Sequence, residues 1–176
     1  MKAFLRETLG IIIAAVVIFL LIQTTLQMAD ITYSSMEPSF HEGQRILVNK
    51  IVYNFHEPER GDVIVLHPPP PYSPDTTPFI KRIIGLPGEL IEIVAGWVFI
   101  DGIKLEEPYI KESPTYNLRR QTIPENEYFV LGDNRNNSND SHVFGTVPRD
   151  NIIGKAWISV WPLSDCGLIP SYSYME

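Results

Sequence analysis

The chain has 176 residues, of which 44% are hydrophobic, and a formal net charge of −7. This length and composition suit one domain with a core large enough to fold unaided. Nucleic acid is not an expected partner, because phosphate binding needs a positive surface and the chain has no basic block. The one cysteine, Cys166, excludes an internal disulfide, and the four scattered histidines lack zinc-ligand spacing. We therefore expect neither a metal nor a cofactor.

A long apolar run lies near the N-terminus. Leu9 to Ile22 carries no polar side chain, and a mildly polar stretch extends the run to Ala29. The full span is close to the ~20 residues that a bilayer-crossing helix needs, whereas the strictly apolar part alone also suits a cleaved secretory signal. Cleavage requires small residues at the last and third-last positions, and Gln27 fits the second of these badly. We therefore expect residues 1–29 to form a cytoplasmic N-terminus and an uncleaved transmembrane anchor.

The charges that flank this run predict its orientation. Lys2 and Arg6 precede the run, and Asp30 follows it. Positive residues favour the cytoplasmic side of a membrane, so the N-terminus is expected in the cytoplasm. Residues 30–176 are then expected to form an extracytoplasmic domain.

Beyond the anchor, short segments rich in β-branched and aromatic residues replace helical periodicity. Most are bounded by Gly, Pro, Asn or Asp, which is the pattern of an all-β domain. Asp101-Gly102 is typical of a two-residue hairpin turn, and Ala95-Gly96 is a second candidate turn. We expect an antiparallel, barrel-like β-sheet domain, with strands at 45–53, 62–66, 79–84, 90–94, 97–100, 128–131 and 156–161.

Two stretches interrupt the strands. Residues 67–78 include a run of four prolines, Pro68 to Pro71, which cannot pair in the centre of a sheet. We expect a stiff surface loop there, with a partner-binding polyproline segment as the alternative. Residues 106–126 are polar with scattered prolines, and they predict a small insertion carried on a hairpin.

Two adjacent serines, Ser34 and Ser35, follow the anchor in the stretch TYSSMEPS. Serine is a weak nucleophile until a base removes its proton, and no histidine–acid pair accompanies these two in the sequence. Lysine can serve as the base instead when burial lowers its pKa from ~10.4 by up to ~3–5 units. A buried lysine would therefore make one of these serines reactive.

Lys81, in the segment FIKRII, is the candidate base. It shares one strand face with Phe79 and Ile83, which would desolvate its amine if that face is the core. Periodicity alone leaves the face open, because isoleucines flank Arg82 equally well, and arginine stays protonated. The alternative is an ordinary strand whose lysine and arginine both reach water.

Four segments, taken in order, resemble the sequence boxes of bacterial type I signal peptidases. TYSSMEPS resembles their serine box, and RGDVIVL (Arg60–Leu66) resembles the next box. FIKRIIGLPGE (Phe79–Glu89) is similar to their lysine box, and LGDNRNNSNDS (Leu131–Ser141) to their last box. The resemblance extends from the N-terminal anchor to about Pro148.

This resemblance implies a Ser-Lys serine protease. It makes Ser35 the nucleophile, with its backbone N–H in the oxyanion hole, and Lys81 the general base. It makes Ser138 the residue that orients the lysine amine. It also implies three residues that brace the site by ion pairing and hydrogen bonding: Asp133, Arg82 and Asp140.

Three positions depart from the pattern of that family. Ser39 stands where relatives usually have threonine, which keeps the hydroxyl group. Tyr33 stands where relatives have serine or glycine, so its hydroxyl is a candidate oxyanion-hole side chain. His142 stands where many relatives have arginine, and pairing with Asp140 would make that contact depend on pH as histidine titrates.

The resemblance implies a membrane-bound endopeptidase that removes signal peptides from exported preproteins after small residues of the Ala-x-Ala type. Its expected setting is the bacterial plasma membrane, and an organellar setting stays open. The implied partners are preprotein signal peptides, the lipid bilayer and the protein export machinery.

Two other functions stay open at this point. One is a self-cleaving Ser-Lys regulator, which the anchor disfavours because such regulators carry a soluble DNA-binding module instead. The other is a catalytically silent relative that acts as a membrane-anchored binding or scaffold protein. The presence of Ser35, Lys81 and Ser138 disfavours this second alternative.

Overall fold

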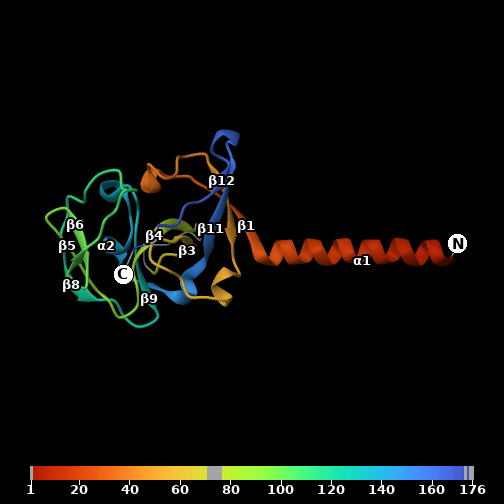
Figure 1. Cartoon of the computed structure of the whole chain (residues 1–176), viewed down its shortest axis with the longest axis horizontal. Coiled ribbons are helices and arrows are strands. Elements are labelled where there is room, and N and C mark those ends of the chain that lie inside the picture. The colour runs from red at the N-terminus through yellow and green to blue at the C-terminus, as the bar shows by residue number, and fades with distance from the viewer. Residues whose placement is uncertain (1, 71–76, 173, 175–176) are drawn as a thin grey trace.

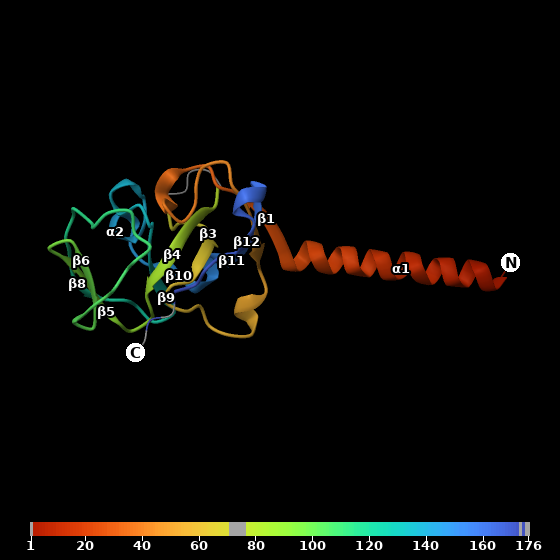
Figure 2. The same cartoon turned by 45° about the horizontal axis from the view of Figure 1, so that its top comes forward.

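An apolar helix projects from a β-rich domain in the computed structural model, which describes residues 2–70, 77–172 and 174 (Figures 1 and 2). This helix, α1 (Lys2–Thr25), has no buried residue in its apolar window, so it is not a core helix of the domain. Within the part of the chain that the structure describes, Arg6–Thr25 alone is long and apolar enough to cross a bilayer. Length, composition and exposure are consistent with a membrane anchor.

The helix ends earlier than the sequence indicates. The expected anchor extends to Ala29, whereas α1 stops at Thr25 and Leu26–Asp30 form the strand β1. The reason is strand pairing, because every residue of β1 has a partner in the antiparallel strand β2 (Arg45–Asn49). Pairing with a neighbouring strand here outweighs the continuation of an apolar run.

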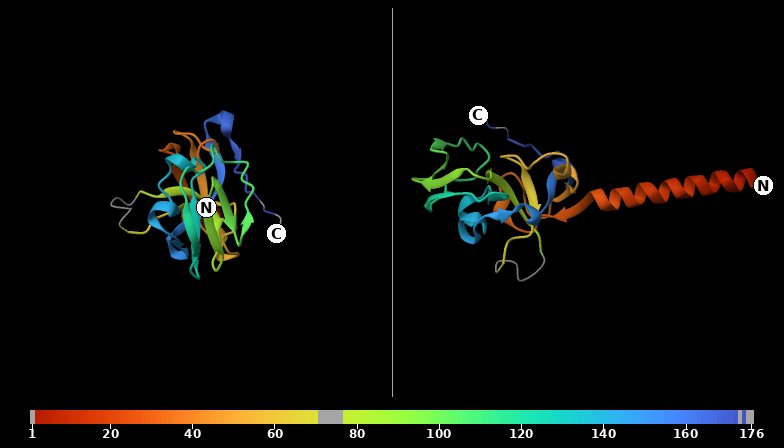
Figure 3. Two further views of the ribbon diagram at one scale, coloured as in Figure 1. Left: turned by 90° about the vertical axis from the view of Figure 1, so that its left-hand side faces the viewer. Right: turned by 90° about the horizontal axis from the view of Figure 1, so that it is seen from below.

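The larger sheet is antiparallel and curves into a half-barrel (Figure 3). Its strand order is β1-β2-β11-β3-β4-β9-β10, and β12 pairs with β11 beside this path. The remaining strands have these bounds: β3 (Val63–Leu66), β4 (Phe79–Gly85), β9 (Glu127–Leu131), β10 (Val147–Pro148), β11 (Ile152–Trp161) and β12 (Gly167–Leu168). The expected all-β, antiparallel, barrel-like class is confirmed.

A smaller sheet lies at the end of the domain farthest from α1 (Figure 1). Its order is β7-β6-β5-β8, with bounds β5 (Leu90–Val94), β6 (Trp97–Ile100), β7 (Ile103–Lys104) and β8 (Leu118–Thr122). Ala95-Gly96 and Asp101-Gly102 turn the chain with positive φ at every position, from 51° to 82°. Strand β8 lies inside the polar stretch 106–126 and pairs with β5.

Two expected strands differ from the structure by more than one residue. The strand expected at 45–53 ends at Asn49, because the side-chain oxygen of Asn49 accepts hydrogen bonds from the amides of Ile51 and Val52 and turns the chain. The short 3-10 helix η2 (Val52–Asn54) follows. Strand β11 begins at Ile152, earlier than the expected 156. Residues 71–76 of the expected proline loop lie outside the described residues.

Strand β4 is central to the fold. Ile83 and Ile84 of β4 belong to two different apolar clusters, and half-buried Ile80 packs against a third. Both faces of the strand are therefore covered, and Lys81 and Arg82 are only 3% and 1% exposed. Periodicity leaves open which face of this strand is buried, and the structure shows that both faces are buried.

Candidate active site

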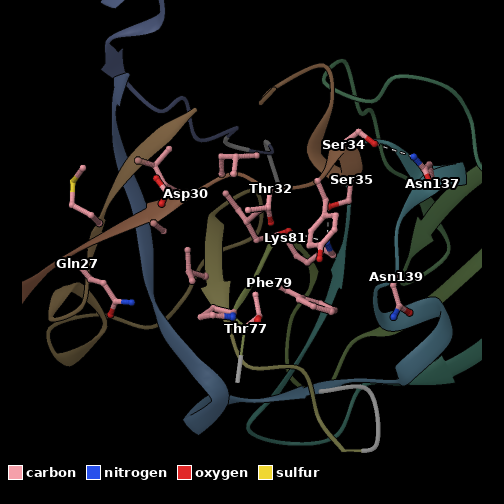
Figure 4. A pocket seen from close by; sticks show the side chains of 18 residues that line it. Gln27, Asp30, Thr32, Ser34, Ser35, Thr77, Phe79, Lys81, Asn137 and Asn139 are labelled. Carbon is pink, nitrogen blue, oxygen red and sulfur yellow. Dashed lines mark hydrogen bonds between the residues drawn. The ribbon is translucent and has the colours of Figure 1, made fainter. Parts of the chain in front are cut away.

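The structure brings Ser35 and Lys81 together from segments 46 residues apart (Figure 4). Ser35 lies in the 3-10 helix η1 (Ser34–Met36), and Lys81 is the third residue of β4. Lys81 Nζ donates a hydrogen bond to Ser35 Oγ over 2.8 Å. Both residues are buried, with exposures of 9% and 3%. This contact can pass a proton directly between the hydroxyl and the amine.

The environment of Lys81 favours the neutral amine. Burial lowers the pKa of Lys81 from 10.5 to about 8, while the negative charges of Asp140 and Asp133 act in the opposite direction. The amine also donates to the carbonyl oxygen of Ile80 over 3.0 Å, and the Phe79 ring centroid lies 5.3 Å away. A useful fraction of the amine is thus unprotonated near neutral pH, as a general base requires.

The neighbouring serine has a different environment. Ser34 Oγ accepts a hydrogen bond from Asn137 Nδ2 over 3.0 Å, and Figure 4 shows the two side chains joined at one side of the pocket. Ser35 instead lies beside Lys81. The geometry therefore distinguishes the two adjacent hydroxyl groups, and only that of Ser35 has a base beside it.

The loop after β9 holds the backbone around the nucleophile. The amide of Asn134 donates to the carbonyl oxygen of Ser35 over 3.0 Å, and Asn134 Nδ2 donates to that of Ser34 over 3.0 Å. A β-carbon on Gly132 would lie 2.4 Å from the Ser35 carbonyl oxygen, so only glycine permits this approach. The sequence reasoning missed Asn134, although its position directly after Asp133 in the box LGDNR was a usable signal.

Ser138 lies in the same loop, close to Gly132. A β-carbon on Gly132 would be 2.3 Å from Ser138 Oγ. This hydroxyl is buried and has no hydrogen-bond partner within the described residues. The Lys81 amine donates to Ser35 and Ile80, so the hydrogen bond expected between Ser138 and Lys81 is not formed in this structure.

Arg82 and Asp133 form a buried ion pair behind the site. Arg82 Nε and Nη2 bind the two carboxylate oxygens over 2.9 and 2.6 Å, and the exposed fractions are 1% and 0%. Ser39 Oγ donates to the same carboxylate over 2.6 Å, and Arg82 Nη1 donates to the Gly61 carbonyl oxygen over 2.8 Å. The forked geometry fixes the relative positions of β4 and the loop after β9.

Asp140, near the end of the loop after β9, binds the start of the same loop. Its carboxylate accepts the Gly132 amide over 2.9 Å and lies 2.6 Å from His142 Nδ1. The His142 ring stacks on Tyr116, with centroids 3.9 Å apart. Asp140 also precedes the short helix α2 (Ser141–Phe144) and accepts the His142 amide. The structure therefore places His142 where it can pair with Asp140.

Tyr33 lies directly before η1 in an extended conformation, with 68% of its surface exposed. Its hydroxyl makes no hydrogen bond within the part of the chain that the structure describes, and the residue lines the pocket beside Ser35. Its position leaves the hydroxyl available to a bound substrate.

A pocket of about 660 Å³ extends from Ser35 and Lys81. One wall is residues 27–33, in and after β1, and the opposite wall is residues 77–80, at the start of β4. Phe79–Lys81 pair with β3 on one side only, because pairing with β9 begins at Arg82. Within the described residues β1 likewise has one partner, so two strand edges with free backbone groups face this pocket. Such edges suit an extended peptide.

The described residues contain no group of histidine, cysteine, aspartate and glutamate side chains that could hold a metal ion.

Comparison with known proteins identifies a family. The family model described as signal peptidase, peptidase S26, matches residues 5–161. The chain is 41% identical over 177 residues to the probable signal peptidase I-1 of Synechocystis sp., covering 98% of this chain and 90% of that protein. It is 44% identical over 174 residues to the signal peptidase I of Leptolyngbya laminosa, covering 94% and 84%. Its identity to the signal peptidase IB of Staphylococcus aureus is 31% over 182 residues, covering 93% of each.

The family match spans most of α1, the smaller sheet, the larger sheet except β12, and every residue of the site described above. The resemblance found in the four sequence boxes is confirmed, and so is the expected activity, the removal of signal peptides by a serine peptidase. The chain belongs to the signal peptidase family, peptidase S26, as a signal peptidase I.

Proposed function

We propose that Ser35 is the nucleophile and Lys81 the general base in this removal of signal peptides. The observation that carries the assignment is the 2.8 Å contact between two buried side chains, one of which has its pKa lowered to about 8. At pH 7 about one amine in ten is then neutral, compared with fewer than about one in a thousand for an exposed lysine.

The reaction begins when neutral Lys81 takes the proton from Ser35 Oγ. The oxygen attacks the scissile carbonyl carbon, and the tetrahedral intermediate collapses as Lys81 gives its proton to the leaving amine. An ester between Ser35 and the signal peptide remains. Lys81 then removes a proton from a water molecule as that water attacks the ester carbonyl, and it returns the proton to Ser35 Oγ as the signal peptide leaves.

The backbone N–H of Ser35 is the proposed donor to the developing oxyanion, a role worth about 3–4 kcal/mol. The Tyr33 hydroxyl is the proposed second donor, since it borders the pocket and has no partner of its own among the described residues. The Tyr33 side chain is longer than the serine that relatives have at this position. For its hydroxyl to donate to the oxyanion, the ring must turn toward the bound substrate.

Three residues are proposed to brace the site, and a fourth to orient the amine. Arg82 and Asp133 hold β4 against the loop after β9, and Asp140 holds that loop through Gly132. Ser138 is proposed to orient the Lys81 amine when substrate is bound, because its buried hydroxyl lacks a partner within the described residues.

The substrate is proposed to bind as an extended strand between the β1 edge and the start of β4. Backbone hydrogen bonds would then hold it in register, and the side chains that point into the pocket would be selected by size. We expect small residues at the last and third-last positions before the cut, the Ala-x-Ala type. Alternate side chains of a strand face the same way, which explains a rule that skips one position.

The proposed setting is the bacterial plasma membrane, with the N-terminus in the cytoplasm and residues 30–176 outside. Lys2 and Arg6, which precede the apolar run Leu9–Ile22, support this orientation. The preprotein, the bilayer and the export machinery are the proposed partners, because the scissile bond emerges at the outer face of the membrane during export.

The test is cleavage of a synthetic preprotein whose signal ends in Ala-x-Ala, using the full chain in detergent and mass spectrometry of the products. Ser35→Ala and Lys81→Met should each abolish cleavage, while Ser34→Ala should retain it. Cleavage that survives Ser35→Ala would overturn the nucleophile assignment. An inert but folded parent would overturn the proposed substrate or place the defect at Tyr33.

A further inference from the structure

The C-terminal segment, defined here as described residues 166–172 and 174, packs behind β4 on the side of Arg82. It follows the short 3-10 helix η5 (Leu163–Asp165) and includes β12, which pairs with β11. A β-carbon on Gly61 would lie 2.1 Å from the Tyr172 carbonyl oxygen, so the segment lies directly on the Gly61 backbone. The family model ends at residue 161, before this segment begins.

Tyr172 covers the guanidinium of Arg82. The Arg82 Cζ atom lies 5.1 Å from the Tyr172 ring centroid and 4.2 Å from that of Tyr109. The two ring centroids are 4.8 Å apart, so together the rings form an aromatic cover over the guanidinium. Cation–π contacts of this kind are strongest when the cation is desolvated, and Arg82 is 1% exposed.

Tyr174 connects the same segment to the loop after β9. Its hydroxyl is hydrogen-bonded to that of Tyr109, which in turn donates to Glu107 over 3.0 Å. Glu107 accepts from Arg135 Nη1 over 2.8 Å, and Arg135 Nε donates to the Gly132 carbonyl oxygen over 3.0 Å. The end of the chain is thus joined by continuous contacts to the glycine against which Ser35 packs.

A second pocket is bordered both by the C-terminal segment and by Arg82. This pocket, of about 380 Å³, is lined in part by Ser39, Arg82 and Tyr172. Without the Tyr172 ring it would open farther onto the guanidinium and onto the Asp133 carboxylate that Ser39 and Arg82 bind. Water would then compete for both partners of the ion pair.

We propose that Tyr172, assisted by Tyr174, is a positioning residue that keeps Arg82 on Asp133 and so limits the negative charge felt by the Lys81 amine. The proposal rests on the assignment of Lys81 as the base. Groups that face Lys81 are Asp133, Asp140 and Ser35. Groups that face Arg82 are Asp133, Ser39, Tyr109, Tyr172 and Tyr174.

The direction of the effect follows from the signs of these charges. The Asp133 carboxylate favours the charged form of Lys81, and the guanidinium bound to that carboxylate offsets this attraction. If Arg82 moves into water, Asp133 attracts the ammonium more strongly and the pKa of Lys81 rises. The base is then protonated over a wider pH range, and cleavage slows at neutral pH but not at high pH.

The experiment is the pH profile of kcat/KM between pH 6 and 10, measured on the full chain in detergent with the synthetic preprotein. Tyr172→Ala should move the rising limb to higher pH by about half a unit, which is roughly a threefold loss at pH 7 that recovers at pH 10. Tyr172→Phe keeps the ring and should match the parent. Leu168→Ala changes an exposed residue of the same segment and should also match the parent.

A loss by the same factor at every pH in Tyr172→Ala, or an unshifted profile, would overturn the proposal. If Tyr172→Ala does not fold, Tyr174→Phe removes only the hydroxyl bonded to Tyr109 and should shift the limb in the same direction by a smaller amount. An unshifted profile there would count equally against it. Failure of the Ser-Lys assignment would be recognised separately, because Lys81→Met would then retain cleavage.

Discussion

The backbone amide of Asn134 and the carbonyl oxygen of Ser35 are joined by a 3.0 Å hydrogen bond, 99 positions apart in the numbering of the chain. This bond fixes the peptide group between Ser35 and Met36. The N–H of Ser35 itself is the proposed oxyanion donor. The position of Ser35 is therefore set from two sides, by Lys81 at its hydroxyl and by Asn134 at its carbonyl. Substitutions in the loop after β9 should disturb catalysis without touching Ser35 or Lys81.

Gly132→Ala tests this relationship. The new β-carbon would meet Ser138 Oγ at 2.3 Å and the Ser35 carbonyl oxygen at 2.4 Å, and because the latter is backbone, η1 must move. We expect a loss of kcat/KM of about a hundredfold, because small misplacements of a reacting group cost this much. Gly167→Ala is the matched control, since a β-carbon there meets nothing within 4 Å. Parent-like activity of Gly132→Ala would contradict the account.

The rate of cleavage should rise with pH through about 8. Burial lowers the pKa of Lys81 to about 8, and only the neutral amine accepts a proton, so kcat/KM should increase about tenfold for each unit below that value and level off above it. Initial rates of preprotein cleavage between pH 6 and 10 measure this. A midpoint near 10.5, the ordinary value for lysine, would mean that the amine is not desolvated in solution.

Lys81→Met should make the protein more stable while it abolishes cleavage. Below pH 8 the folded state must bury a charged amine that the unfolded chain leaves in water, at a cost of about 3 kcal/mol. The unfolded state binds more protons between about pH 8 and 10.5, so the stability of the parent rises through that window and the advantage of the variant fades.

Denaturation at pH 7 and at pH 10 measures this difference between Lys81→Met and the parent. Ser35→Ala is the control, because it removes the same contact but leaves the amine buried, and it should show no such gain. A Lys81→Met variant less stable than the parent at pH 7 would argue that the amine is well solvated.

His142→Arg should alter the pH dependence of activity between pH 5 and 8. Arginine stays charged throughout this range, whereas the 2.6 Å contact between His142 and Asp140 is an ion pair only while the ring is protonated. The variant keeps the ion pair at every pH, so the ratio of variant to parent activity should be largest where the ring is neutral. An equal ratio from pH 5 to 8 would show that the pair does not influence the site.

Much of the fold could be predicted from the sequence where strands are apolar and bounded by turns. Strands β5 and β6 begin and end at the expected residues, since Ala95-Gly96 and Asp101-Gly102 mark their ends. The sequence does not predict β1 or β8, because the residues of β1 extend the apolar run of the expected anchor and LRRQT lacks apolar alternation. Their identity as strands depends on partners far along the chain, which local sequence does not contain.

The site was predictable in part for a similar reason. The boxes pointed to Ser35 and Lys81, yet periodicity could not show that both faces of β4 are covered, because the covering groups come from other segments. Tyr109 and Tyr172 cover Arg82 from residues 27 and 90 positions away in the numbering. Neither tyrosine lies in a motif, so only the folded chain shows their place beside Arg82.

The passage from α1 into β1 has a mechanical consequence. The carbonyl oxygen of Thr25, the last residue of the helix, accepts the Lys50 amide over 2.9 Å, and Leu26 is already paired with Asn49. No linker separates α1 from the sheet, because β1 begins at the residue after the helix ends. The domain therefore cannot rotate freely relative to the helix. With α1 as the membrane anchor, we expect the tilt of the helix to set the height of Ser35 above the lipid and the direction in which the pocket opens, and so to set how far a signal peptide must emerge before it is cut.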